Sequence, residues 1–295
     1  MANYRAIIRE FPCAVDYLRH ATKWVRRGDV LAYPPLVRTS SFSTDAFGFR
    51  HTCFEGRDIG IGDIATYPRV GLVLGSSHVF GFSLSDNSET LPSRLSELVG
   101  YPFVGIAFPE ADTRTLHATL ARMAQQFADR IQQVVLIAGG DFTRFCYSGI
   151  ADPLFGPPLL PQESSVELAE GEPRQLANIL QFSLFWIGRC VETAAQYGIR
   201  FTLADDVTFF EKSAPDALEQ ACQLGIALAS GQQKRFETHA RHKSSFQAQR
   251  RQSISNRGWV FAQFPDPDKL LYVDEYHYRA ESQRLIAQVL AEQLL

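Results

Sequence analysis

The chain has no run of 18 uncharged apolar residues, and this absence argues against a membrane-spanning helix. The most apolar window, residues 182–191, is too short to cross a bilayer and contains Arg189, so it is typical of a core helix. The first ten residues carry charges throughout and include no apolar stretch of the kind found in secretory signals. We therefore expect a protein with neither a signal peptide nor a membrane partner.

Paired cysteines are also missing. The chain has five cysteines, which is an odd number, and no two of them form a Cys-x-x-Cys pair. They are Cys13, Cys53, Cys146, Cys190 and Cys222. This usage fits a reducing compartment better than a disulfide framework, and we expect a cytoplasmic protein.

An excess of positive charge is absent as well. Lysine and arginine number 29 against 32 acidic residues, for a net charge of −3. This balance argues against a nucleic-acid partner bound through bulk positive charge.

No nucleotide-binding motif stands in a suitable context. Gly60–Ala65 superficially matches a dinucleotide fingerprint, but no strand precedes it. No Gly-Lys-Ser/Thr follows Gly75, as a P-loop requires. The sequence thus predicts no cofactor.

What is present indicates a globular protein with a large core. Hydrophobic residues make up 45% of the 295 residues, and charged residues make up 21%. A chain of this length can bury about 75% of its unfolded surface, so it needs no metal or disulfide staple. Residues 1–69 are predicted to form an N-terminal helix, at 3–26, and an irregular wrapping segment. Residues 70–295 are predicted to form an α/β domain with a loop and helical insertion around 142–252.

From Val70 onward, short apolar runs alternate with helical patterns. The predicted strands are Val70–Leu74, Phe103–Phe108, Val134–Ala138, Ile199–Leu203 and Trp259–Phe264. The predicted helices span 91–99, 113–130, 172–197, 214–252 and 280–294. Buried strands separated by helices favour a three-layer αβα sandwich around a doubly wound, five-stranded parallel sheet. Ligands bind such sheets beyond the carboxyl ends of the strands, so the residues after each run are the informative ones.

A serine follows the first predicted strand, in the segment Gly75-Ser76-Ser77. A serine next to glycine at a strand end is well placed as an exposed nucleophile, because glycine permits the tight turn. A helix that follows would direct backbone N–H groups at an oxyanion. The alternative is an ordinary turn in which serine caps the helix.

An aspartate and a histidine follow the last predicted strand, three residues apart, at Asp274 and His277. The aspartate could orient the imidazole, and the imidazole could activate a serine hydroxyl, which is a poor nucleophile at neutral pH. The alternative is that Asp274 caps the final helix and His277 is a surface residue. Together the two segments supply Ser, Asp and His at one edge of one sheet, which is the composition of a catalytic triad.

These segments resemble the sequence blocks of the SGNH (GDSL-type) hydrolases. Val73–Gly81 is similar to the first block, and Asp274-Glu275-Tyr276-His277 with the helix after it is similar to the last. Phe47-Gly48-Phe49-Arg50 resembles a lead-in of bacterial members associated with polysaccharide or secondary-metabolite pathways. The resemblance implies a flavodoxin-like fold and an ester hydrolase that works through an acyl-enzyme. It makes Ser77 the nucleophile, His277 the general base and Asp274 the orienting carboxylate.

The resemblance is incomplete at the predicted oxyanion site, which comprises Ser77, Ala107 and Gly140. Ser76 stands where the family has aspartate, Ala107 where it has glycine, and Gly140 where it has an asparagine that donates to the oxyanion. Backbone N–H groups of Ser77 and Ala107 remain as candidate donors. Two alternatives to a hydrolase therefore stay open. One is an acyltransferase to an alcohol or amine, and the other is a catalytically degenerate binding or scaffold protein.

Two further features carry weaker functional hypotheses. His239 and His242 lie three apart on a predicted helix, but the adjacent Arg241 and Lys243 disfavour a cation, so no metal is predicted. The stretch 234–251 is rich in lysine and arginine. It is either a solvated helix face or a docking site for an anionic partner, such as a phosphopantetheine carrier protein or a coenzyme A phosphate.

Two segments follow strands at the edge of the sheet where the active site is predicted, and the sequence leaves more than one function open for each. Residues 142–161 are rich in proline, glycine and aromatics, and they indicate a lid or the wall of an acyl pocket, or plain surface packing. Asp205 and Asp206 follow the fourth strand, where they could hold a substrate hydroxyl or cap the next element. The substrate expected at this edge is a small-molecule or carrier-bound ester.

Overall fold

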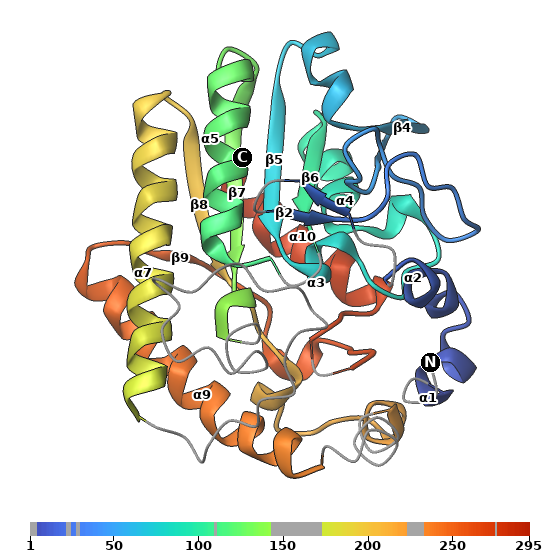
Figure 1. Ribbon diagram of the computed structural model, residues 1–295, viewed down its shortest axis with the longest axis vertical. Coiled ribbons are helices and arrows are strands. Elements are labelled where there is room, and N and C mark those ends of the chain that lie inside the picture. Colours follow the sequence, from blue (N-terminus) through green and yellow to red (C-terminus); the bar gives the residue numbers. More distant parts are fainter. Residues whose placement is uncertain are drawn as a thin grey trace.

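A parallel five-stranded sheet forms the centre of the computed structural model, which describes residues 5–21, 25–27, 30–108, 111–142, 173–222, 233–274 and 276–295 (Figure 1). The strands lie in the order β6-β5-β7-β8-β9, and each neighbouring pair is parallel. Their bounds are β5 Val70–Gly75, β6 Phe103–Ala107, β7 Ile131–Ala138, β8 Arg200–Asp205 and β9 Phe261–Ala262. Numbered along the chain, this is the 2-1-3-4-5 order of flavodoxin-like folds, so the fold prediction is confirmed.

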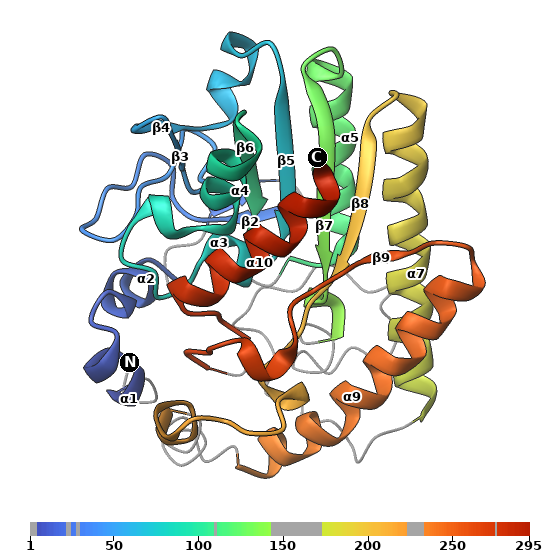
Figure 2. The ribbon, with the colours of Figure 1, turned by 180° about the vertical axis from the view of Figure 1, so that it is seen from behind.

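Helices cover both faces of the sheet (Figures 1 and 2). On one face, α5 (Thr113–Phe127) and α7 (Pro173–Gln196) pack with Leu72 and Leu74 of β5. On the other, α4 (Leu91–Val99) and α10 (Ala280–Leu294) pack with Val73. Side chains alternate between the faces of a strand, so a continuous apolar run supplies both cores at once. The predicted helices at 91–99, 113–130, 172–197 and 280–294 are confirmed to within three residues.

The N-terminal segment differs from the prediction. In place of one helix over 3–26 there are two short helices, α1 (Arg5–Glu10) and α2 (Ala14–Ala21), followed by strand β1 (Val25–Arg27). Pro12 causes the break, because proline disfavours helical backbone in the residue before it and cannot donate a helix hydrogen bond. Strand β1 pairs with β2 (Val30–Ala32) in an antiparallel hairpin.

The wrapping segment contains more regular structure than predicted. It includes the hairpin β3 (Thr52–Phe54) and β4 (Arg57–Ile59), followed by the 3₁₀ helix η2 (Ile61–Thr66). Its aromatic residues pack against α3 (Ser77–Phe80), the short helix that follows β5. The ring of Tyr33 stacks on that of Phe80, with 4.5 Å between centroids. The N-terminal residues therefore share a core with the sheet.

The region after β8 also departs from the single predicted helix over 214–252. A 3₁₀ turn, η4 (Phe209–Glu211), precedes a short helical stretch at 217–222, and α9 then spans Gln233–Asn256. The other short elements are the 3₁₀ helices η3 (Asn87–Glu89) and η5 (Pro267–Lys269). Most of the predicted lid, residues 143–161, lies outside the described residues. No helix in the described ranges combines the length and apolar character that crossing a bilayer requires.

Candidate active site

The structure brings Ser77, His277 and Asp274 into one hydrogen-bonded chain. Ser77 Oγ lies 2.7 Å from His277 Nε2, although 200 residues separate the two in sequence. On the other side of the ring, His277 Nδ1 lies 2.6 Å from Asp274 Oδ2. The three residues predicted from sequence therefore meet in the order that general-base activation of a serine requires.

Local packing sets the position of Ser77. It is the first residue of α3, a single helical turn that begins directly after β5. A Cβ on Gly75 would lie 2.3 Å from Val79 Cγ2, so only glycine lets this turn fold back over the strand end. The turn ends at Gly81, whose φ of 84° is left-handed and favours glycine.

A tight loop holds Asp274 and His277 together. Asp274 Oδ1 accepts hydrogen bonds from the backbone N–H groups of Tyr276 and His277, both at 2.9 Å. Burial acts to raise the pKa of Asp274, but the charge of His277 and these hydrogen bonds outweigh it and hold the pKa below its usual value. Asp274 thus stays ionised, and it keeps the imidazole oriented with Nδ1 toward it and Nε2 toward Ser77.

Residues that the sequence analysis did not single out anchor this loop. Lys212 and Glu219 form a buried ion pair at 2.9 Å. Lys212 Nζ donates to the carbonyl of Leu270 at 2.7 Å, and Glu219 accepts from the backbone N–H of Tyr272 at 2.8 Å. No local sequence signal marks such a pair, because its partners lie more than 50 residues away along the chain.

Two residues, Phe82 and His78, lie against the His277 imidazole and within the α3 turn. The ring of Phe82 lies against that of His277, with 4.5 Å between centroids. On the buried side of the turn, Ser76 Oγ lies 2.8 Å from His78 Nδ1, and His78 Nε2 has no hydrogen-bond partner among the described residues. Burial, with the nearby charges of His277 and Lys243, lowers the pKa of His78 to about 3. His78 is therefore a neutral residue at physiological pH.

The three predicted oxyanion positions lie near this turn. Ala107 ends β6 and is paired in register with Gly75. Gly140 lies beside Ser76, because a Cβ added to it would be 3.4 Å from Ser76 Cβ. The same Cβ would be 2.3 Å from the carbonyl oxygen of Ala111, so the position where the family carries asparagine has no room for a side chain here. The roles of Ser77, Ala107 and Gly140 as oxyanion donors stay predictions.

Asp141, next to Gly140, is hydrogen-bonded to the first residue of α5. Its buried carboxylate accepts from the backbone N–H and the hydroxyl of Thr113, at 2.7 and 2.5 Å. Burial and the adjacent carboxylate of Asp112 raise the pKa of Asp141. The side chain therefore ties the start of α5 to the residues after β7.

The basic stretch on α9 is not simply a solvated face, and for Lys243 and Arg250 that interpretation is wrong. Both side chains are 0% exposed. Lys243 Nζ lies 3.3 Å from Asp206, and Arg250 bonds both Asp205 and Asp206. The more exposed Arg251 pairs with Asp205 at 2.5 Å. Asp205 and Asp206 thus hold α9 against the carboxyl edge of β8.

Burial raises the pKa of Asp206 to about 6, against the opposing effect of Lys243. The carboxylate of Asp206 also lies directly over Gly139, where an added Cβ would be 1.7 Å from its carboxyl carbon. Among the described residues no group of three or more His, Cys, Asp or Glu side chains is placed to hold a metal ion. The side chain of His239 lies outside the described residues.

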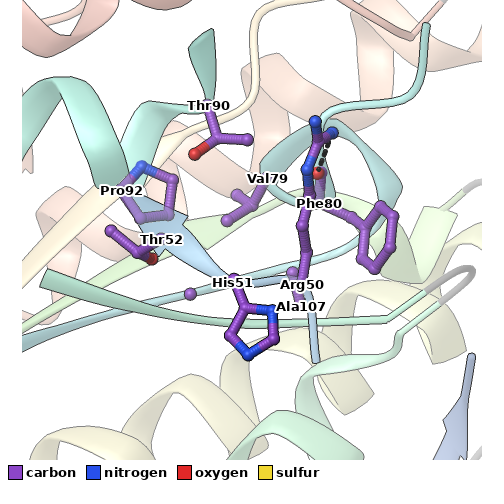
Figure 3. A pocket seen from close by; sticks show the side chains of 9 residues that line it. Arg50, His51, Thr52, Val79, Phe80, Thr90, Pro92 and Ala107 are labelled. Atoms are coloured by element: carbon purple, nitrogen blue, oxygen red, sulfur yellow. Dashed lines mark hydrogen bonds between the residues drawn. The ribbon is translucent and has the colours of Figure 1, made fainter. Parts of the chain in front are cut away.

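A small cavity lies behind the α3 turn (Figure 3). It is lined by Arg50–Thr52 of the wrapping segment, by Val79 and Phe80 of α3, and by Ala107 of β6, among others. It is distinct from the Ser77–His277 contact, since neither of those residues lines it.

Comparisons with known proteins found similar solved structures at low sequence identity. No family model matches the sequence, and no curated protein matches it. Similar solved structures include a protein titled as an SGNH hydrolase from Slackia heliotrinireducens, with 16% identity and a TM-score of 0.43, covering 78% of this chain and 100% of that one. A GDSL-like lipase from Bacteroides thetaiotaomicron has 11% identity and a TM-score of 0.46, covering 79% and 96%.

A carbohydrate esterase family 2 enzyme from Corynascus thermopiles, with a carbohydrate-binding domain, is also similar. It has 15% identity and a TM-score of 0.41, covering 81% of this chain and 69% of that one.

Proposed function

We propose that this chain is a serine-dependent ester hydrolase of the SGNH type, which acts on a small-molecule or carrier-bound acyl ester. The observation that carries the proposal is the hydrogen-bonded chain from Ser77 Oγ through His277 to Asp274 Oδ2. Its position, beyond the carboxyl ends of parallel strands, is where ligands bind in doubly wound sheets.

The proposed reaction has two halves. Ser77 Oγ attacks the ester carbonyl as its proton passes to His277 Nε2, and the tetrahedral intermediate expels the alcohol as His277 returns the proton to it. Water then attacks the acyl-enzyme, again with His277 as the base, and releases the acid and free Ser77. Asp274 stabilises the imidazolium in both halves without accepting its proton.

Fewer donors serve the oxyanion in this proposal than in the family pattern. The backbone N–H groups of Ser77 and Ala107 are the proposed donors, and no side chain at position 140 can join them. Loss of one oxyanion donor typically costs about 2.7–4 kcal/mol of transition-state stabilisation. We therefore propose a slower hydrolase than one with all three donors.

Labelling with a fluorophosphonate probe tests the nucleophile. The wild type should be labelled and Ser77→Ala should not, whereas Ser85→Ala, which alters an exposed serine eight residues along, should be labelled as the wild type is. Turnover of p-nitrophenyl acetate and butyrate should follow the same order. Equal labelling of Ser77→Ala and wild type would refute the proposal.

The two alternatives make different predictions in the same assays. A scaffold protein would show no turnover dependent on Ser77. An acyltransferase would form transfer products when alcohols or amines are supplied with an acyl carrier substrate. The basic stretch that motivates a carrier protein is partly committed to internal ion pairs at Lys243, Arg250 and Arg251, so no observation favours transfer over hydrolysis.

A further inference from the structure

Arg50 is buried behind the turn that carries Ser77, with 4% of its surface exposed. Its Nη1 donates to the carbonyls of Gly81 at 2.8 Å and Phe80 at 3.2 Å (Figure 3 draws the side chains of Arg50 and Phe80). The other contacts reach three further segments. Nε donates to Asn87 Oδ1 at 2.9 Å, Nη2 to the carbonyl of Ser41 at 2.9 Å, and Nη1 to the hydroxyl of Tyr17 at 2.5 Å.

The guanidinium is buried without a carboxylate partner. Its acceptors are neutral, and among the described residues it forms no salt bridge. It lies over the rings of Tyr17, Phe42 and Phe80, with 5.5 to 5.9 Å from Cζ to the ring centroids. A buried cation is costly unless its donors are satisfied. An apolar side chain would avoid that cost but could not bond the two carbonyls.

The turn needs such a restraint because it is too short to hold itself. Forming the first turn of a helix fixes several backbone dihedrals for one hydrogen bond, and a helix of one turn adds few further bonds to offset that entropy cost. Its last carbonyls also have no partner within the helix. Arg50 supplies partners for the carbonyls of Phe80 and Gly81, at the end of the turn opposite Ser77. Nη1 bonds both carbonyls, while Nε and Nη2 of the same planar fork bond Asn87 and Ser41. A lysine ammonium is a single point donor and cannot join the turn to both other segments in this fixed geometry.

We infer that Arg50 is a positioning residue that holds the α3 turn so that Ser77 Oγ stays in hydrogen-bond reach of His277 Nε2. The inference rests on the proposed function. Arg50 does not contact the reacting atoms. It acts by fixing the end of the turn to the wrapping segment at Ser41 and to η3 at Asn87.

The test compares two changes to the same cluster. Arg50→Lys keeps the cation and most of the aliphatic stem but loses the fork. Tyr17→Phe removes one acceptor of the guanidinium and leaves both bonds to α3 in place. We expect Arg50→Lys to lower kcat and the rate of fluorophosphonate labelling by about tenfold to 10²-fold, with KM nearly unchanged, since a misplacement of about 1 Å costs up to 10²-fold.

For Tyr17→Phe we expect a lower urea midpoint but a labelling rate within about threefold of the wild type, because the bonds to the turn remain. Urea unfolding and circular dichroism of both variants separate folding from reactivity. Arg50→Met, which keeps the bulk without any donor, should lose at least as much reactivity as Arg50→Lys.

The outcomes separate this inference from the proposed function. A wild type whose labelling does not depend on Ser77 overturns the proposed function. A wild type with Ser77-dependent labelling, beside an Arg50→Lys variant with wild-type kcat, overturns only the role of Arg50. Two further outcomes overturn the positioning role of Arg50: equal losses of reactivity in Arg50→Lys and Tyr17→Phe, or failure of both Arg50 variants to fold. In either case Arg50 would act through stability alone.

Discussion

Ser77 Oγ and His277 Nε2 lie 2.7 Å apart, although the two residues stand in loops at opposite ends of the α/β region of the sequence. Ser77 follows β5, the first strand of the sheet along the chain, and His277 precedes α10, the last helix. Gln283 on α10 donates from Nε2 to the carbonyl of His78 at 2.9 Å, so the final helix is bonded directly to the α3 turn. This bond explains how residues so distant in sequence keep a fixed separation.

Asp274→Asn should remove most of the activity while leaving the fold intact. An asparagine whose Oδ1 keeps the backbone N–H groups of Tyr276 and His277 turns its NH₂ group toward His277 Nδ1. A donor there cannot accept the Nδ1 proton or stabilise the imidazolium, so the imidazole loses the tautomer that serves as base. In serine proteases this change lowers kcat by about 10⁴-fold. The measurement is kcat for p-nitrophenyl butyrate. Asp268→Asn, which changes an exposed aspartate in η5, is the control and should keep wild-type kcat.

Gly140→Asn should not restore the donor that the family pattern carries. Its Cβ would lie 2.3 Å from the carbonyl of Ala111, so the backbone must shift beside Ser76. We expect a lower kcat and a loss of stability of about 1–3 kcal/mol from overpacking. Gly62→Asn is the matched control, because a Cβ there meets nothing within 4 Å. A Gly140→Asn variant that is faster than the wild type would contradict the geometry.

His78→Asn should make the protein less sensitive to acid. The pKa of His78 is about 3 in the folded protein, below the ordinary value of 6.5, so the unfolded chain binds the extra proton first. The wild type therefore loses stability as pH falls from about 6.5 toward 3, by at most about 1.4 kcal/mol per pH unit from this residue. Asparagine can keep the bond to Ser76 but does not titrate.

Urea midpoints of the two proteins across this pH range provide the measurement. Asp206, whose pKa of about 6 lies above its ordinary value, acts in the opposite direction between about pH 4 and 6, but it is present in both proteins. The difference between them therefore isolates His78. Parallel midpoint curves would show that His78 does not control the acid response.

Lys243→Met should be strongly destabilising, because it leaves the buried carboxylate of Asp206 with Arg250 as its remaining cation. Removing one partner of a buried pair typically costs about 3–5 kcal/mol. The cost should grow between pH 5 and pH 8, since without Lys243 the pKa of Asp206 rises further and ionisation becomes less favourable. Arg189→Met, at an exposed pair with Glu192, should change the unfolding free energy by no more than about 0.5 kcal/mol. Equal effects of the two changes in urea unfolding would show that the α9 pairs are not buried in solution.

The sheet and its main helices could be predicted from sequence because their signals are local. The helix expected at 91–99 is Leu91–Val99 in the structure, where Thr90 caps the first turn and Gly100 ends the last. The last strand was predicted as Trp259–Phe264 and is only Phe261–Ala262, because an edge strand is limited by the partner that it pairs with. The helix over 3–26 was wrong, since apolar spacing was given more weight than Pro12.

By itself, the sequence determined which segments form strands and which form helices. It also placed a serine, an aspartate and a histidine after the ends of strands. Apolar spacing and turn residues act over a few positions, so they can be seen without knowing what packs where. Only the tertiary structure decided that Asp206 meets Lys243, that Gly140 has no room for a side chain, and that Arg50 is bonded to the turn of Ser77. Those relationships join segments far apart in the chain, and they depend on how the layers pack rather than on any local pattern.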